Sequence, residues 1–209
     1  MNETVARSMV MLSAVGVLMG SGTSAFEYYS NSNTGSIAAD YRGDGRTDRA
    51  IRRPSTGVWH LVYSSPGRTE GVQWDIRDDI PTPGDYDGDG LPDLAYWRPS
   101  TGDWHVVLSS TGEHTTVQWG SKGDIPVPGD YDGDGLTDLA YWRPSTGDWH
   151  VVLSSTGEHS AVQWGSMGDI PSPGDYNGDG RTDWVVWRPS AGSWYVIYSY
   201  TDCQATYHW

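Results

Sequence analysis

Residues 85–129 read DYDGDGLPDLAYWRPSTGDWHVVLSSTGEHTTVQWGSKGDIPVPG, and residues 130–174 repeat this stretch with only five differences. Diverged copies start at Asp40 and at Asp175, so one unit of 45 residues recurs four times along the chain. A fixed period of this length is typical of structural units that stack on one another, such as the blades of a β-propeller. The repeat therefore predicts duplicated, stacked units rather than two unrelated domains.

The third unit indicates which structure each copy forms. Prolines predict a short extended segment over residues 125–131, and β-branched and aromatic residues predict strands over 138–143, 149–154 and 160–164. Polar turns separate these segments, so the unit is expected to be a four-stranded meander. The predicted fold class is all-β, a β-propeller of four-stranded antiparallel blades made from four 45-residue repeats. Four blades could close alone, or two chains could combine into eight.

The first 25 residues are expected to lie outside this fold. Arg7 precedes a short apolar stretch and then small residues, which is the order found in a secretory signal peptide. The alternative is a buried core helix or an uncleaved anchor. The predicted domains are a signal peptide at 1–25 and a four-blade propeller at 26–209. The expected location is secreted or on the cell surface.

Composition limits the partners. Lys and Arg total 13 against 27 Asp and Glu, for a formal net charge of −14, and an acidic surface repels phosphate backbones. We therefore expect no nucleic-acid partner, and no membrane span because no stretch reaches roughly 18 apolar residues. The single cysteine, Cys203, cannot form a disulfide within the chain. It is predicted to be accessible at the tip of the last hairpin, where it could pair between chains in a homodimer.

The strongest chemical signal is the loop motif D-x-D-G-D-G-x-x-D. Short carboxylates at loop positions 1, 3, 5 and 9 and a backbone carbonyl at position 7 can supply the six to eight oxygens that Ca²⁺ prefers. Glycines at positions 4 and 6 allow the sharp turn that brings them together. The candidate calcium ligands are Asp85, Asp87, Asp89, Leu91 and Asp93 in the second unit, Asp130, Asp132, Asp134, Leu136 and Asp138 in the third, and Asp175, Asn177, Asp179, Arg181 and Asp183 in the fourth.

Other interpretations of this loop fit less well. Four crowded carboxylates without a cation would repel by several kcal/mol at intermediate dielectric, and Mg²⁺ prefers fewer ligands in a rigid octahedron. An EF-hand is excluded because the twelfth loop position holds Tyr96 or Tyr141 instead of glutamate. A solvated Asp/Gly turn remains the alternative, and the repetition of the motif argues against it.

The first unit carries a degenerate copy of the loop. Asp40, Asp44 and Asp48 remain, but Arg42 occupies the third ligand position. A guanidinium cannot coordinate a cation, yet it can neutralise the carboxylates from inside the loop. We expect a salt-bridged substitute or a weak site here.

Three stretches together carry a family resemblance: Gln118-Trp119-Gly120, residues 124–135 (DIPVPGDYDGDG) and residues 142–147 (WRPSTG). They resemble the bacterial VCBS-type FG-GAP repeats, which are relatives of the integrin alpha-subunit propeller. The resemblance covers about residues 30 to 209. It implies calcium-binding blades in secreted or surface proteins, often linked to adhesion or carbohydrate binding.

The function expected from these observations is non-catalytic. Histidines recur in register, as at His60, His105 and His150, whereas an enzyme site is normally a unique constellation. We expect a secreted calcium-binding module that binds or adheres to an extracellular protein or glycan. One alternative is a multivalent lectin, in which Trp97, Trp142 and Trp187 would contact sugars. The other is an accessory propeller of a secreted hydrolase system. Most of these tryptophans could instead pack between blades, which is the interpretation we favour.

Overall fold

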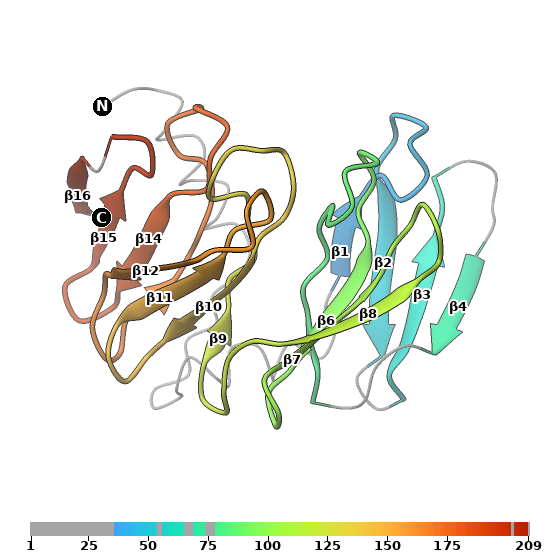
Figure 1. Ribbon diagram of the computed structural model, residues 1–209, viewed down its shortest axis with the longest axis horizontal. Helices are drawn as coiled ribbons and strands as arrows, with labels where there is room; N and C mark the ends of the chain where they lie inside the picture. The colour runs from blue at the N-terminus through green and yellow to red at the C-terminus, as the bar shows by residue number, and fades with distance from the viewer. Residues whose placement is uncertain (1–35, 54–55, 65–68, 74–77, 202, 209) are drawn as a thin grey trace.

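The computed structural model describes residues 36–53, 56–64, 69–73, 78–201 and 203–208 (Figure 1). The signal peptide expected at residues 1–25 lies outside the described residues. Within the described ranges every regular element is a β-strand, and the strands form four four-stranded sheets. None of the described segments forms a helix that could span a membrane.

Each 45-residue unit contributes one sheet. The first sheet contains β1 (Ser36–Ala39), β2 (Asp48–Arg53), β3 (Val58–Val62) and β4 (Thr69–Gln73). The second contains β5 (Ile80–Pro81), β6 (Leu94–Arg98), β7 (Asp103–Val107) and β8 (His114–Gln118). The third contains β9 (Ile125–Pro126), β10 (Leu139–Arg143), β11 (Asp148–Val152) and β12 (His159–Gln163). The fourth contains β13 (Ile170–Pro171), β14 (Trp184–Arg188), β15 (Ser193–Ile197) and β16 (Gln204–His208).

Every sheet is an antiparallel meander whose strands pair in chain order. In the third sheet, Trp149 of β11 pairs with Trp142 of β10 on one side and with Val162 of β12 on the other. The second sheet has the same register, with Trp104 between Trp97 and Val117. The three long strands predicted in the third unit are found with ends shifted by no more than two residues. The predicted all-β architecture of four-stranded antiparallel units is confirmed.

The first strand of the third sheet is short because prolines interrupt its hydrogen bonding. Pro126 and Pro128 have no N–H, so only alternate residues of this segment can donate to β10. Val127 N donates to Ala140 O at 2.8 Å and continues the pairing beyond the end of β9. The first unit lacks these prolines, and β1 accordingly pairs with β2 over four residues.

The hydrophobic core lies between successive sheets. Trp142 and Trp149 of the third sheet are 0 % exposed and belong to a buried cluster that includes Trp184 of the fourth sheet. Trp149 meets Trp184 edge-on at 5.6 Å between ring centroids, and Tyr131 stacks on Trp184 at 4.4 Å. Leu139 of the third sheet likewise packs against the core of the second. Each sheet therefore buries side chains against the next one, as blades of a propeller do.

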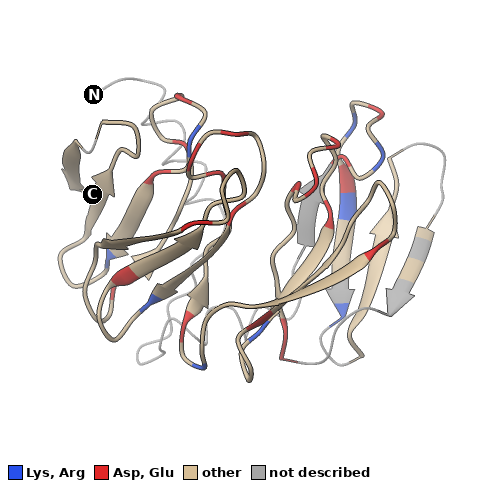
Figure 2. Ribbon diagram, in the orientation of Figure 1, with Lys and Arg blue, Asp and Glu red and all other residues tan. Residues whose placement is uncertain are grey.

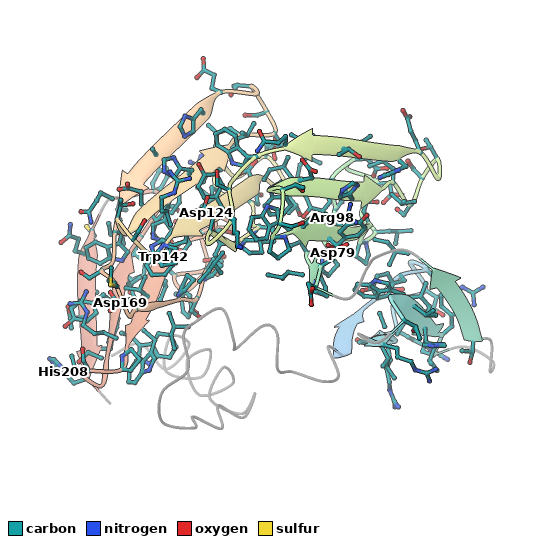
Figure 3. The ribbon with its side chains drawn as sticks, turned by 90° about the horizontal axis from the view of Figure 1, so that it is seen from below. Asp79, Arg98, Asp124, Trp142, Asp169 and His208 are labelled. Atoms are coloured by element: carbon teal, nitrogen blue, oxygen red, sulfur yellow. The ribbon has the colours of Figure 1, made fainter. Side chains whose placement is uncertain are left out.

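The four sheets follow one another in chain order along an arc (Figure 3). The sheet of β1–β4 lies at one end of this arc and the sheet of β13–β16 at the other. The described strands of the first and the last sheet do not pair with each other. The fold of the described residues is propeller-like, with no ring closed by a hydrogen-bonded strand pair.

Neighbouring sheets approach closely where Gly129 of the third unit faces Thr182 of the fourth. A Cβ added to Gly129 of the third unit would lie 2.5 Å from Oγ1 and 2.9 Å from Cγ2 of Thr182 in the fourth unit. Thr182 is buried, and its N–H donates to Asp130 O at 2.5 Å. A residue with a side chain would therefore not fit at position 129, because Thr182 of the next sheet lies too close.

This contact predicts the effect of Gly129→Ala. The added methyl group would collide with Thr182, whose branched side chain is held by burial, and we expect a loss of about 1 to 3 kcal/mol of unfolding free energy. Gly174→Ala is the matched control, because Gly174 holds the same position in the last unit and its added Cβ would meet Tyr176 of the same unit at 3.3 Å. Denaturant unfolding of both variants measures the difference. Equal losses would contradict the assigned contact.

Candidate functional site

Four acidic loops lie at one end of the sheets. Each connects the first strand of a sheet to the second, and Figure 2 shows Asp and Glu residues in these loops at the upper end of the molecule. The loops comprise residues 40–48, 85–93, 130–138 and 175–183, which are the segments that carry the sequence motif.

The first aspartate of each loop organises its backbone. Asp85 accepts hydrogen bonds from Gly88 N at 2.7 Å and Gly90 N at 2.9 Å, so the chain folds around this carboxylate. Both glycines have positive φ, 82° and 80°, which residues with a side chain rarely adopt. The third unit repeats the arrangement around Asp130. The glycines of the motif therefore have the conformational role expected from the sequence.

The loop turn brings carboxylates together. Oxygen atoms of Asp85, Asp87 and Asp89 all lie within 4.8 Å of one another. In the third unit the same holds for Asp130, Asp132 and Asp138. Hard oxygen donors at this spacing are the ligand set that Ca²⁺ takes, and the residues present therefore fit a calcium ion.

The ninth loop residue is buried rather than exposed in the loop. Asp93 and Asp138 are 0 % exposed. Asp93 accepts hydrogen bonds from Tyr86 N and Ser109 N, both at 2.7 Å, and Asp138 accepts the equivalent pair from Tyr131 N and Ser154 N. Burial raises the pKa of Asp93 and of Asp138, partly offset by these N–H groups. This carboxylate fastens the loop to the neighbouring hairpin.

Serines in the turn between the third and fourth strands of a sheet also contact the loop. The sequence motif did not indicate them. Ser109 Oγ donates to Asp89 Oδ2 at 2.7 Å, and Ser110 Oγ donates to Asp87 Oδ2 at 2.5 Å. Ser154 and Ser155 make the same bonds in the third unit. The Ser-Ser pair sits at a fixed distance from the acidic motif in both units, which is a sequence signal that could have identified it.

The fourth loop carries fewer charges. Asn177 replaces the second aspartate, and its amide Nδ2 donates to Asp179 Oδ2 at 2.8 Å. Asp175 still accepts from Gly178 N and Gly180 N, at 2.6 and 2.9 Å, so the backbone turn is preserved. The loop keeps the shape of its neighbours while one carboxylate is replaced by an amide.

The first loop departs from the expectation for Arg42. Asp40 still organises the turn, accepting from Gly45 N at 2.7 Å. Asp48 is 0 % exposed and accepts hydrogen bonds from Tyr41 N and Ser64 N. The guanidinium of Arg42, however, lies over the ring of Tyr63 at 4.7 Å from its centroid. The ion pairs among the described residues do not include Arg42, so the expected salt bridge inside the loop is replaced by a cation–π contact.

The tryptophans considered as sugar contacts lie mainly in the core. Trp97 and Trp142 are 0 % exposed, and their ring N–H groups donate to Trp119 O and Trp164 O. Trp187 is partly buried and packs against Trp194 at 5.1 Å between ring centroids. Because Trp97 and Trp142 offer no exposed face, the structure contradicts their assignment as ligand contacts. They pack between sheets instead.

A second repeated group, not identified from the sequence, lies at the opposite end of the sheets. Arg143 at the end of β10 makes two parallel hydrogen bonds to Asp124 just before β9, Nε to Oδ1 at 2.9 Å and Nη2 to Oδ2 at 2.8 Å. The Asp124 side chain is 3 % exposed and that of Arg143 is 33 % exposed. Hydrogen bonds to Asp124 raise the pKa of Arg143. Equivalent pairs join Arg98 to Asp79 and Arg188 to Asp169; Figure 3 labels all three aspartates and Arg98.

The comparison with protein families agrees with the sequence motif. Residues 85–141 match the family described as FG-GAP-like repeat, which supports an FG-GAP-like repeat protein. The matched segment contains the second acidic loop and extends through the third into β10. No curated protein matched the chain.

Solved structures with a similar fold have diverse descriptions. Virginiamycin B lyase from Staphylococcus aureus, in its selenomethionine form, has a TM-score of 0.50 at 10 % identity over 83 % of this chain and 54 % of that one. BBS1N, in a complex with ARL6DN soaked with lead, has a TM-score of 0.54 at 9 % identity over 83 % and 56 %. A protein of unknown function from Bacteroides caccae has a TM-score of 0.50 at 12 % identity over 83 % and 61 %. The chain thus spans little more than half the length of these structures, and the likeness concerns the fold alone.

The buried ion pair predicts the effect of changing Arg143. In Arg143→Ala the buried Asp124 carboxylate keeps the hydrogen bond from Ser121 N and loses both bonds from the arginine. We expect a loss of about 2 kcal/mol of unfolding free energy, after allowing for the exposure of the arginine. Arg143→Lys keeps the charge without the two parallel bonds and should lose less. Lys122→Ala, which removes an exposed positive charge from the same region, is the control and should change stability by less than about 0.5 kcal/mol. A similar loss in Lys122→Ala would show that net charge, not the pair, is responsible.

Proposed function

We propose that this protein is a calcium-binding, propeller-like module that acts outside the cell by binding a protein or glycan ligand without catalysis. The observation that carries the proposal is the convergence of Asp85, Asp87 and Asp89 on one point of the second loop, repeated by carboxylates of the third. The FG-GAP-like match over residues 85–141 supports the same interpretation. The calcium ions would be held by the loop carboxylates and would fix the loops at one end of the sheets.

The repeated construction favours a binding role over catalysis. The second and third units differ at only five of 45 positions, so most surface features of one recur on the other, and weak identical sites add through avidity. The burial of Trp97 and Trp142 removes the main support for a lectin with tryptophan-lined pockets. A protein or glycan ligand would instead meet exposed loops and hairpins. A role as the accessory propeller of a secreted hydrolase would use the same surfaces.

Calcium titration tests this proposal. We expect calorimetry to detect about three ions in the parent, two in Asp134→Ala and three in Asp44→Ala, because Arg42 already occupies a ligand position of the first loop. Asp44→Ala is the matched control, since it removes the same carboxylate from an equivalent turn. Binding restricted to the folded form should also stabilise the protein, by about 2.7 kcal/mol per site at a hundredfold excess over Kd, so a chelator should lower Tm. A parent that binds no calcium would reduce the loops to solvated turns.

Sedimentation tests the oligomeric state. The first and last sheets lie at the two ends of an arc (Figure 3), and we expect two chains to combine their sheets into one larger assembly. The sedimenting mass should then be twice that of the chain without its expected signal peptide. Cys203 is exposed, so the measurement is repeated with a reductant to separate assembly from a disulfide between chains. A monomer under both conditions would favour four blades alone.

A further inference from the structure

Two pairs of histidines lie on the outer strands of the second and third sheets. His105 of β7 and His114 of β8 place Nδ1 and Nε2 3.3 Å apart. His150 of β11 and His159 of β12 place the same two atoms 3.2 Å apart. The two rings of each pair are nearly parallel, with interplanar angles of 27° and 22°. The arrangement is therefore the same in both sheets.

Sheet register explains why the two rings meet. His105 pairs across the ladder with Thr116, and His114 lies two residues before Thr116, so its side chain projects from the same face of the sheet. Tyr96, opposite His105 on the other side, stacks on the imidazole at 4.6 Å and holds the ring. Nε2 of His105 is buried without a hydrogen-bond partner, so packing against Tyr96 sets the ring orientation that places Nδ1 beside His114.

The separation of the two nitrogens is that of neighbouring ligands on one metal ion. A metal–nitrogen bond of about 2.0 to 2.1 Å and a tetrahedral angle separate two ligand nitrogens by about 3.3 Å. Imidazole is a preferred ligand of Zn²⁺, Cu²⁺ and Ni²⁺, whereas Ca²⁺ and Mg²⁺ prefer oxygen. We propose that each histidine pair is a two-nitrogen site for a divalent transition-metal ion, separate from the acidic loops, with water in the remaining coordination positions.

The two sites differ in one neighbouring group. The Thr116 hydroxyl lies 3.2 Å from His105 Nδ1 and 3.4 Å from His114 Nε2, where it can hydrogen-bond to a metal-bound water. Ala161 stands at this position in the third sheet and offers no such group. The third-sheet pair instead borders Trp119 of the second unit, whose ring meets that of His159 edge-on at 4.8 Å. Cu²⁺ bound there would lie close enough to Trp119 to quench its fluorescence.

The outer two units are natural controls. In the first unit His60 has Thr69 at the partner position, and in the fourth unit Tyr195 and Gln204 replace both histidines. Neither combination supplies two imidazole nitrogens. The proposal therefore assigns two transition-metal ions to each chain, independent of the number of calcium ions.

Titration of the full chain with Cu²⁺, in excess Ca²⁺ that competes for the carboxylate loops, tests the assignment. We expect calorimetry to show two Cu²⁺ sites in the parent, one in His114→Gln, one in His159→Gln and neither in the double variant. In electron paramagnetic resonance, the spectrum of the parent minus that of the double variant should show nitrogen splitting. His208→Gln removes a histidine outside the pairs and should retain both sites.

Circular dichroism and Tm in Ca²⁺ establish that each variant is folded before the counts are compared. Cu²⁺ binding at the amino terminus or elsewhere would persist in the double variant, so the difference in stoichiometry between parent and double variant decides the question. A difference of two supports the proposal. No difference would overturn it and leave each pair as an imidazole–imidazole hydrogen bond. Because calcium binding is measured separately, loss of the calcium proposal would not alter this outcome.

Discussion

The buried aspartate at the ninth loop position connects each acidic loop to its sheet. Burying a carboxylate is costly unless its oxygens are hydrogen-bonded, and each of these carboxylates accepts one N–H from its own loop and one from the next hairpin. Asp138, for example, joins Tyr131 N to Ser154 N. The same bonds recur around Asp48, Asp93 and Asp183. The position of every loop therefore depends on a side chain that is itself withdrawn from solvent.

The loops are also linked from one unit to the next. Thr137 N donates to Asp85 O at 2.7 Å, and Thr182 N donates to Asp130 O. The equivalent residue of the second unit is Pro92, which has no N–H and cannot make this bond to the first loop. This series of hydrogen bonds therefore joins the second, third and fourth loops and does not extend to the degenerate first loop. An ion bound in one connected loop would stabilise the sheet beside it.

The charged side chains at the two ends of each sheet are arranged differently. At one end, carboxylates gather close together and accept hydrogen bonds from backbone N–H and hydroxyl groups, an arrangement suited to a cation. At the other end, each buried aspartate is already paired with an arginine, as Asp124 is with Arg143. Two parallel hydrogen bonds satisfy both groups, so this end is structural. The histidine pairs lie on the outer strands of the second and third sheets, where ring nitrogens of the two residues face each other.

The sequence by itself determined the period, the strands and the residues of the acidic loops, because each depends on local pattern. Alternating apolar residues, prolines and glycines constrain the backbone over a few residues, and repetition at 45 residues extends that pattern to the whole chain. Only the tertiary structure decided which side chains are shielded by a neighbouring sheet. Burial of Trp97 and Trp142 depends on the next sheet covering them, and no pattern within one unit distinguishes a covered tryptophan from an exposed one. The contact of Arg42 with Tyr63 and the pairing of His105 with His114 also join residues from separate segments of the chain, so they follow from register and packing rather than from the composition of either segment.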